Sequence, residues 1–109
     1  MNNYIQVITT ISDKPGAEKI ANALIEKKLA ACVQMLGPVK SIYRWKEKVE
    51  TAKEFMCVIK TRKTLYKKVE KQIKEIHPYE VPEIIAVSIV KGSRDYLKWL
   101  SKETIKNNG

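Results

Sequence analysis

The sequence predicts an α+β fold of the ferredoxin-like type, with the order β-α-β-β-α-β and a further helix at the C-terminus. Short runs rich in β-branched residues alternate with segments whose apolar residues recur every three or four positions. This order is the split β-α-β plan, in which right-handed crossovers place both main helices on one face of a four-stranded antiparallel sheet. A chain of 109 residues is expected to form one domain, residues 1–109.

The plan begins with a strand and a helix. Tyr4–Ile11 (YIQVITTI) favours a strand through its β-branched content. Ser12 and Asp13 offer N-caps for the helix, and Pro15 suits its first turn. The apolar residues that follow lie at i, i+3, i+4, i+7 and i+8, which predicts one apolar helix face that ends near Leu29.

A long hairpin comes next, with strands Ala31–Trp45 and Glu54–Thr61 around a charged turn region, Lys46–Lys53. A continuous first strand would be roughly 45–50 Å long at about 3.3 Å per residue. A compact domain of this length is only roughly 35 Å across. Either Gly37-Pro38 bends the ribbon back, or its far end projects and pairs with another chain. Because an isolated two-stranded ribbon is marginal in water, we favour a partner subunit.

The second half of the plan starts with an amphipathic helix whose apolar residues recur after Thr64 at spacings of four, four and three. This helix is expected to stop at His77, because Pro78 disfavours a helical conformation in the residue before it. The two prolines in His77–Glu83 then predict an ordered, extended connection.

The remaining elements are a strand, Ile84–Val90, and a last helix, Arg94–Ile105, with Gly92-Ser93 breaking the strand and capping the helix. Asn107–Gly109 is expected to be a frayed tail.

The inner strands carry apolar side chains on both faces. In Glu54–Thr61, for example, Cys57 and Ile59 fall on one face, and Met56 and Val58 fall on the other. An antiparallel sheet with one wet face would alternate apolar and polar residues. The second face must therefore be covered by another subunit, or in part by the C-terminal helix.

The chain carries a formal net charge of +9, and seven basic residues face one acidic residue between Lys60 and Lys74. A solvated, lysine-rich helix face explains this better than a nucleic-acid surface. RNA binding on this plan needs exposed aromatics on strands one and three, which offer only Tyr4 and Phe55, so no nucleic-acid partner is expected. The sequence has neither an 18-residue apolar run nor a signal pattern, which predicts a cytoplasmic protein without a membrane partner.

The two cysteines are predicted to be reduced. A hairpin that turns near Glu47 sets Cys57 opposite about Pro38, and Cys32 opposite about Lys63. These positions exceed the roughly 6 Å between α-carbons that a disulfide allows. Both residues are interpreted as small core hydrophobes.

The only histidine, His77, lies within six residues of Tyr79, Glu80 and Glu83. Imidazole with carboxylates suits a borderline divalent ion such as copper or zinc, and these residues are the candidate metal ligands. One histidine does not complete a four-ligand site within one chain. The alternative is a structural His77 that hydrogen-bonds the last helical carbonyls and packs against Tyr79. Both interpretations stay open.

Nothing in the sequence indicates an enzyme. It contains no nucleophile elbow, P-loop or dinucleotide fingerprint, and His77 cannot be tied to a nucleophilic serine or cysteine. Tyr43 and Trp45 share one face near the hairpin tip, where exposed aromatics more often anchor an interface than bind a ligand. We assign Tyr79 to the same interface.

Five fragments in the right order, spanning nearly the whole chain, together resemble the CutA family of divalent-cation tolerance proteins. They are Leu29–Val33 (LAACV), Ser41–Trp45 (SIYRW), Ile59–Thr61 (IKT), His77–Ile84 (HPYEVPEI) and Asp95–Leu100 (DYLKWL). The resemblance implies a ferredoxin-like subunit in a tight homotrimer, with strands extended across subunits. It also implies a cytosolic role in tolerance of Cu(II) and other divalent ions, with metal binding and without catalysis.

The chain departs from the family at several positions. The family usually has glycine two residues after the hairpin tryptophan, where this chain has Glu47, so the turn should differ in shape. Some members carry cysteine in the place of Thr9 and a second histidine in the place of Ile76. Only His77 carries over as a metal ligand, which Glu80 or groups of a neighbouring subunit could complete.

A second hypothesis is a small-ligand sensor in the manner of the PII signalling trimers, which share this architecture. Their clefts between subunits hold an anionic nucleotide or metabolite. In this chain the phosphate contacts would be Arg44, Lys60 and Arg62.

Overall fold

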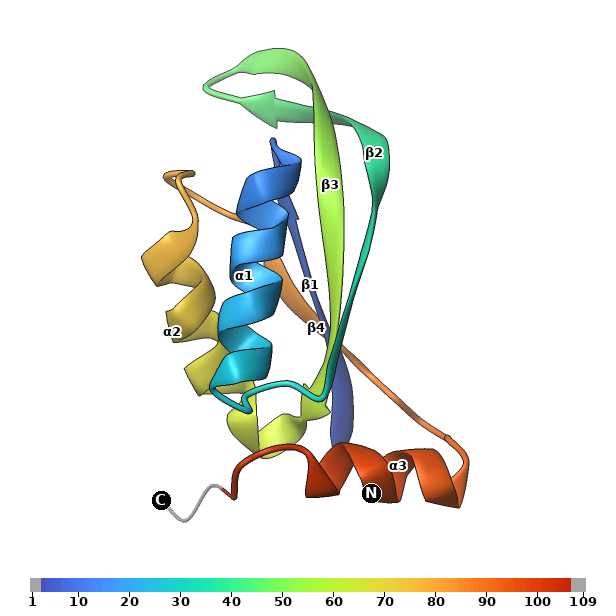
Figure 1. The fold of residues 1–109 in the computed structure, drawn as a ribbon. Coiled ribbons are helices and arrows are strands. Elements are labelled where there is room, and N and C mark those ends of the chain that lie inside the picture. The colour runs from blue at the N-terminus through green and yellow to red at the C-terminus, as the bar shows by residue number, and fades with distance from the viewer. Residues whose placement is uncertain (1–2, 107–109) are drawn as a thin grey trace.

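The structure is a computed structural model that describes residues 3–106. Its elements are β1 (Tyr4–Ile11), α1 (Lys14–Glu26), β2 (Cys32–Trp45), β3 (Lys48–Arg62), a 3-10 turn (Lys63–Leu65), α2 (Tyr66–Ile76), β4 (Ile84–Ser88) and α3 (Arg94–Lys102). The four strands form one antiparallel sheet in the order β2-β3-β1-β4 (Figure 1). This arrangement confirms the predicted α+β plan. The tail predicted at 107–109 lies outside the described residues.

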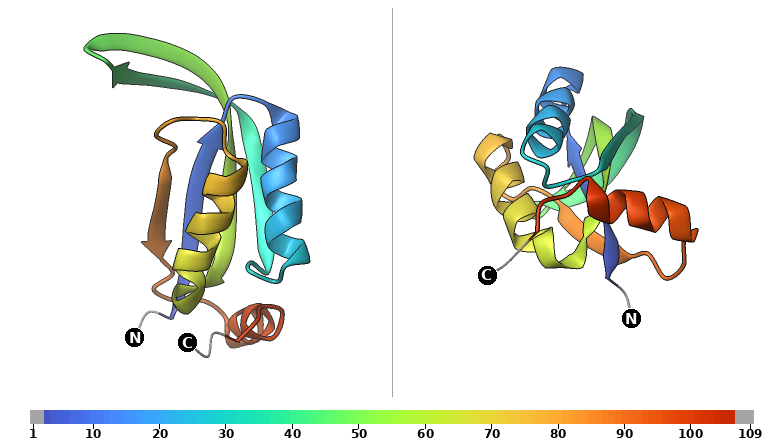
Figure 2. Two further views of the ribbon diagram at one scale, coloured as in Figure 1. Left: turned by 90° about the vertical axis from the view of Figure 1, so that its left-hand side faces the viewer. Right: turned by 60° about the horizontal axis from the view of Figure 1, so that its bottom comes forward.

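The core lies between this sheet and the two main helices, which both cover the same face (Figure 2). Its fully buried side chains include Val7, Ile20, Leu24, Ile59 and Ile73. None of the helices among the described residues is long and apolar enough to cross a membrane.

Helix α1 begins and ends through local backbone chemistry. The Gly16 N–H donates to the Asp13 side chain at 2.6 Å, which confirms the predicted N-cap. The helix ends at Glu26, three residues before the predicted Leu29, and Lys28 has a left-handed φ of 56°. A left-handed residue closes the last turn and directs the chain toward β2.

The opposite face of the sheet is apolar and largely uncovered. Leu36, Ile85 and Val87 are each about half exposed. Helix α3 lies across one end of the molecule (Figure 1). There the Tyr4 and Ser101 hydroxyls form a 2.7 Å hydrogen bond. The prediction of two apolar faces is confirmed, and the chain itself covers only part of the second one.

The hairpin turn is much tighter than predicted. Only Lys46 and Glu47 separate β2 from β3, with φ values of 50° and 66°. Two consecutive residues with positive φ are typical of the two-residue turns that match the twist of a hairpin. The eight-residue turn predicted over Lys46–Lys53 is therefore wrong. The charged residues after Glu47 belong to a strand whose two faces are both exposed, so their polarity does not indicate a loop.

The hairpin both bends and projects, whereas its pairing with another chain stays a prediction. The β2–β3 register shifts between Leu36 and Val39, and Gly37 has a φ of 152°. A side chain at Gly37 would lie 3.0 Å from the Phe55 ring, so only glycine fits this turn. Beyond it the ribbon bends and extends past the beginning of α1 (Figure 1), and the molecule measures 44 × 25 × 24 Å.

The cysteines pair with other residues than predicted: the position of the turn at Lys46 and Glu47 displaces the register by two residues, and the shift between Leu36 and Val39 adds one. Cys57 pairs with Met35 and Cys32 pairs with Lys60, each three residues from the expected partner. Both thiols are free, as predicted. Burial raises the pKa of the Cys57 thiol to about 11, so this sulfur stays protonated at neutral pH.

The second half of the chain follows the plan with shorter elements. A 3-10 turn precedes α2, β4 ends at Ser88 rather than Val90, and α3 ends at Lys102 rather than Ile105. The Ser93 hydroxyl accepts from the Tyr96 N–H at 3.3 Å and confirms the predicted cap of α3. After α3 the chain turns back, and the Ile105 N–H donates to the Lys28 carbonyl at 2.9 Å.

Candidate functional site

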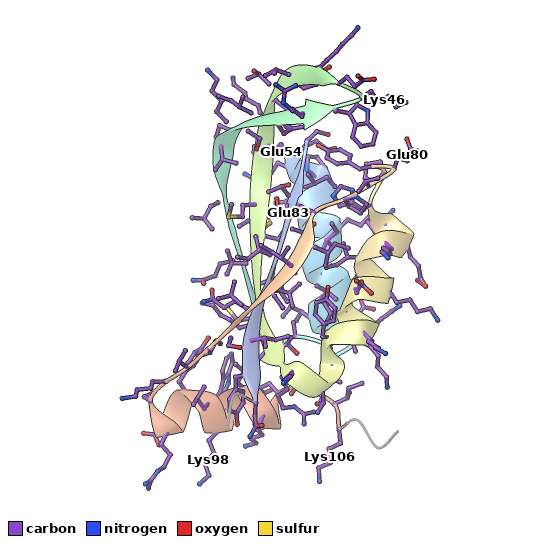
Figure 3. The ribbon with its side chains drawn as sticks, turned by 180° about the vertical axis from the view of Figure 1, so that it is seen from behind. Lys46, Glu54, Glu80, Glu83, Lys98 and Lys106 are labelled. Atoms are coloured by element: carbon purple, nitrogen blue, oxygen red, sulfur yellow. The ribbon has the colours of Figure 1, made fainter. Side chains whose placement is uncertain are left out.

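A cleft of about 860 Å³ lies between the far half of the hairpin and the connection from α2 to β4. Its walls include Tyr43 and Trp45 on β2, Glu54 on β3, and Tyr79, Glu80 and Glu83 on the connection. Figure 3 shows Glu54, Glu80 and Glu83 at the end of the molecule nearest the hairpin tip. The cleft thus brings together most of the residues that the sequence marks as metal or interface candidates.

Glu54 is the most buried charged group of the cleft, with only 5% of its surface exposed. The Tyr79 hydroxyl donates to its Oε2 at 2.9 Å. Burial and then this bond raise the pKa of Tyr79, which keeps the phenol protonated as a donor. An enclosed carboxylate with one neutral donor is costly to desolvate and favours a cation nearby. Sequence reasoning missed Glu54, because nothing in the sequence distinguishes it from the other charged residues of the ribbon.

His77 is held by hydrogen bonds on both ring nitrogens. The Tyr79 N–H donates to Nδ1 at 3.2 Å, and Nε2 lies 2.6 Å from the Thr10 carbonyl. Because Nδ1 accepts, Nε2 carries the proton and donates to Thr10. The ring also makes an edge contact with Tyr79, with centroids 4.5 Å apart.

This arrangement favours the structural interpretation of His77. Its backbone N–H ends α2 by donating to the Ile73 carbonyl at 2.8 Å, whereas its ring joins the connection to β1 rather than to the last helical carbonyls. Neither ring nitrogen has a lone pair free for a metal ion. Within residues 3–106, no three His, Cys, Asp or Glu side chains lie close enough to hold one.

The predicted set of His77, Glu80 and Glu83 therefore does not form a complete metal site in a single chain. The two glutamates line the cleft, whereas His77 is only 8% exposed and is not one of the lining residues. Carboxylate and phenol oxygens are the donors that the cleft presents. They suit hard divalent ions better than copper, which prefers imidazole or thiolate donors.

The aromatic candidates lie on the exposed part of the hairpin. Tyr43 and Trp45 remain 44% and 37% exposed, and the Lys46 ammonium lies 5.7 Å from the centre of a Trp45 ring. Tyr79 is partly buried by its contacts with His77 and Glu54. Their assignment to an interface stays a prediction.

The three predicted phosphate contacts do not converge. Arg44 lies beside the turn, in register with Val49, whereas Lys60 and Arg62 lie at the other end of β3. The Lys60 ammonium donates to the Gln34 side chain at 2.5 Å. Arg62 binds the segment that follows α3. Its Nε donates to the Thr104 hydroxyl at 2.9 Å, and its guanidinium also donates to the Ile105 carbonyl. No anion site forms from these three residues within one chain.

Residues 5–103 match the model of the CutA1 divalent ion tolerance protein family. The Divalent-cation tolerance protein CutA of Thermus thermophilus is 41% identical over 98 residues, which cover 90% of this chain and 95% of that protein. The chloroplastic Protein CutA of Arabidopsis thaliana is 38% identical, and this chain spans 55% of its length.

Solved structures give the same result. The crystal structure of CutA1 from Oryza sativa superposes with a TM-score of 0.93 at 37% identity and covers 96% of both chains. A structure from Archaeoglobus fulgidus, described as a periplasmic divalent cation tolerance protein CutA, gives a TM-score of 0.89 at 37% identity. It covers 92% of this chain and 97% of that one.

Proposed function

Because the chain belongs to the CutA1 divalent ion tolerance protein family, we propose that it acts in tolerance of divalent cations, as a homotrimer and without catalysis. The observation that carries the proposal is the carboxylate-lined cleft, in which the buried Glu54 accepts a hydrogen bond from the neutral Tyr79 hydroxyl. Three glutamates and one cationic residue, Arg44, line this cleft, and divalent ions would reduce its excess of negative charge.

The donor set supports weak binding that is not selective for copper. Glu80 and Glu83 would supply oxygen ligands, and Glu54 would add charge from the cleft wall. Because residues 3–106 of one chain do not gather three such ligands, groups of a neighbouring subunit would complete the site. His77 would act by positioning the connection, through its bonds to Thr10 and Tyr79.

The trimer is supported by surface that the chain leaves uncovered. The helix-free face exposes Leu36, Ile85 and Val87, and the far half of the hairpin exposes Ile42 and Val49. Exposed apolar surface of this extent is typical of subunit contacts. We expect Tyr43→Asp or Trp45→Asp to give aggregates or unfolded chain in analytical ultracentrifugation, since a desolvated charge would disrupt the contact. A well-folded monomer from either variant would contradict an obligate trimer.

The metal proposal is tested by calorimetric titration of the purified trimer with Cu²⁺ and Mn²⁺. We expect Glu80→Gln/Glu83→Gln to weaken binding of both ions by about tenfold or more, because two charged ligands are lost. Glu18→Gln/Glu26→Gln, on the exposed side of α1, removes the same charge and should bind like the wild type. Equal binding by the two double variants would refute a site in the cleft.

His77→Ala addresses the histidine separately. We expect the variant to bind Cu²⁺ with the same heat as the wild type, because both ring nitrogens of His77 already make hydrogen bonds. That result would exclude His77 as a ligand. Loss of Cu²⁺ binding with Mn²⁺ binding retained would identify His77 as a copper ligand.

A cytoplasmic location stays a prediction, which fractionation of the source cells would test.

A further inference from the structure

A second cleft, of about 600 Å³, opens where the beginning of α2 meets β1 and β4. Its walls include Lys63, Lys67 and Lys68 from the 3-10 turn and α2, Tyr66 between them, and Ile5 and Ser88 from the strands. Ile5 and Ser88 are partners in the sheet and lie on its helix-covered face. Figure 2 shows the beginning of α2 beside the end of β4.

The charge of this cleft is opposite to that of the first. Three of its lining residues are lysines and none is acidic. The one acidic residue of the lysine-rich segment, Glu70, accepts a hydrogen bond from the Tyr66 hydroxyl at 3.1 Å. Three lysine side chains line one concave surface, and their like charges repel each other and attract a multiply charged anion. A solvated lysine-rich helix face does not require a concave surface beside it, so the cleft is a feature that the charge of the helix alone does not explain.

The floor of the cleft is apolar. Ile5 is 4% exposed, and Ala86 and the Tyr66 ring complete the surface around it. The volume falls within the range of small-molecule sites, roughly 300–1,000 Å³, and greatly exceeds that of a bare phosphate ion. An apolar or aromatic group of the ligand would fill the remaining space.

We propose that this cleft binds a small phosphate ester that carries an apolar or aromatic group. The three lysines would bind the phosphate as flexible point charges, the Ser88 hydroxyl would offer a further hydrogen bond, and the apolar group would pack on Ile5 and Tyr66. The cleft lies on the helix-covered side of the sheet, opposite the apolar face that we propose as a subunit contact. The proposal does not depend on metal binding.

The test is a titration of the ¹⁵N-labelled full chain, followed by NMR at constant ionic strength, with three probes. Phenyl phosphate carries both parts of the proposed ligand, inorganic phosphate carries the charge, and benzyl alcohol carries the ring. We expect phenyl phosphate to give saturable shifts at 63–68 and 86–88 and to bind more tightly than either other probe. Saturable shifts elsewhere, or none with any probe, would overturn the proposal.

A matched pair of variants separates the cleft from net charge. Lys67→Gln/Lys68→Gln should weaken phenyl phosphate binding by about tenfold or more, because charged hydrogen bonds are lost. Lys71→Gln/Lys74→Gln removes two exposed lysines from the same helix outside the cleft and should bind within about twofold of the wild type. Equal losses in the two variants would overturn the proposal, since they would show only general attraction to a basic protein.

A phosphate ester can be a free metabolite or a lipid headgroup, and sedimentation with vesicles distinguishes these sources. The vesicles are phosphatidylcholine alone or phosphatidylcholine with phosphatidylinositol phosphate. Binding to the second kind that is lost in Lys67→Gln/Lys68→Gln would support the site with a lipid headgroup as its ligand. Phenyl phosphate binding without vesicle binding would support it with a free ester.

Discussion

The two halves of β3 form the same secondary structure in opposite surroundings. Between Phe55 and Thr61, alternate side chains at Cys57, Ile59 and Thr61 are fully buried under the helices. From Lys48 to Lys53 the strand pairs with β2 as regularly, yet nearly every side chain is exposed. Backbone pairing therefore extends this ribbon well beyond the part that the core of the chain stabilises. The far half, which also forms one wall of the acidic cleft, is the part that the core of the chain stabilises least.

The largest expected effect lies in the buried half of β3. Ile59→Ala removes a side chain with no exposed surface and should lower the free energy of unfolding by about 3–4 kcal/mol, because a cavity remains among its neighbours. Lys53→Ala, on the exposed half of the same strand, should change it by less than about 0.5 kcal/mol. Chemical denaturation at one fixed protein concentration measures both. Similar losses at the two positions would remove the contrast between the halves.

Two buried threonines sharpen the description of the packed half. The Thr61 hydroxyl donates to the Leu29 carbonyl at 2.6 Å, whereas the buried Thr9 hydroxyl has no hydrogen-bond partner within residues 3–106. Thr61→Val should destabilise the chain by about 1–3 kcal/mol, because a buried carbonyl loses its donor. Thr9→Val should stabilise it by about 1 kcal/mol, because an unpaired hydroxyl is removed. Thermal and chemical denaturation would measure the change in stability of each variant. A loss of stability in Thr9→Val would indicate that the Thr9 hydroxyl has a hydrogen-bond partner.

The smallest effect is expected at the turn of the exposed half. Glu47 adopts a left-handed conformation, which costs a residue with a side chain about 1 kcal/mol. Glu47→Gly should therefore raise the free energy of unfolding by up to about 1 kcal/mol, and Glu50→Gly within the adjoining strand should lower it by about 0.5–1 kcal/mol. Equilibrium denaturation of the two variants compares them directly. A lower free energy of unfolding in both variants would mean that Glu47 makes a compensating contact in the assembled protein.

The sequence by itself determined the type and order of the elements. Residue spacing specifies an amphipathic helix or a strand, and single residues specify ends, as Asp13 and Ser93 do for α1 and α3. Pro78 likewise ended α2 at Ile76, before His77. The excess of apolar residues on both faces of the inner strands was also visible. These signals are local, so they need no knowledge of neighbouring segments.

Only the tertiary structure decided the site. Local spacing placed His77 beside Glu80 and Glu83, but the fold turns its ring toward the Thr10 carbonyl, 67 positions earlier. Glu54 is the buried carboxylate of the cleft, where it accepts a hydrogen bond from Tyr79. Arg62 donates instead to Thr104, in the segment that follows α3. A side chain's hydrogen-bond partners depend on which distant segments pack beside it. No pattern of neighbouring residues records that.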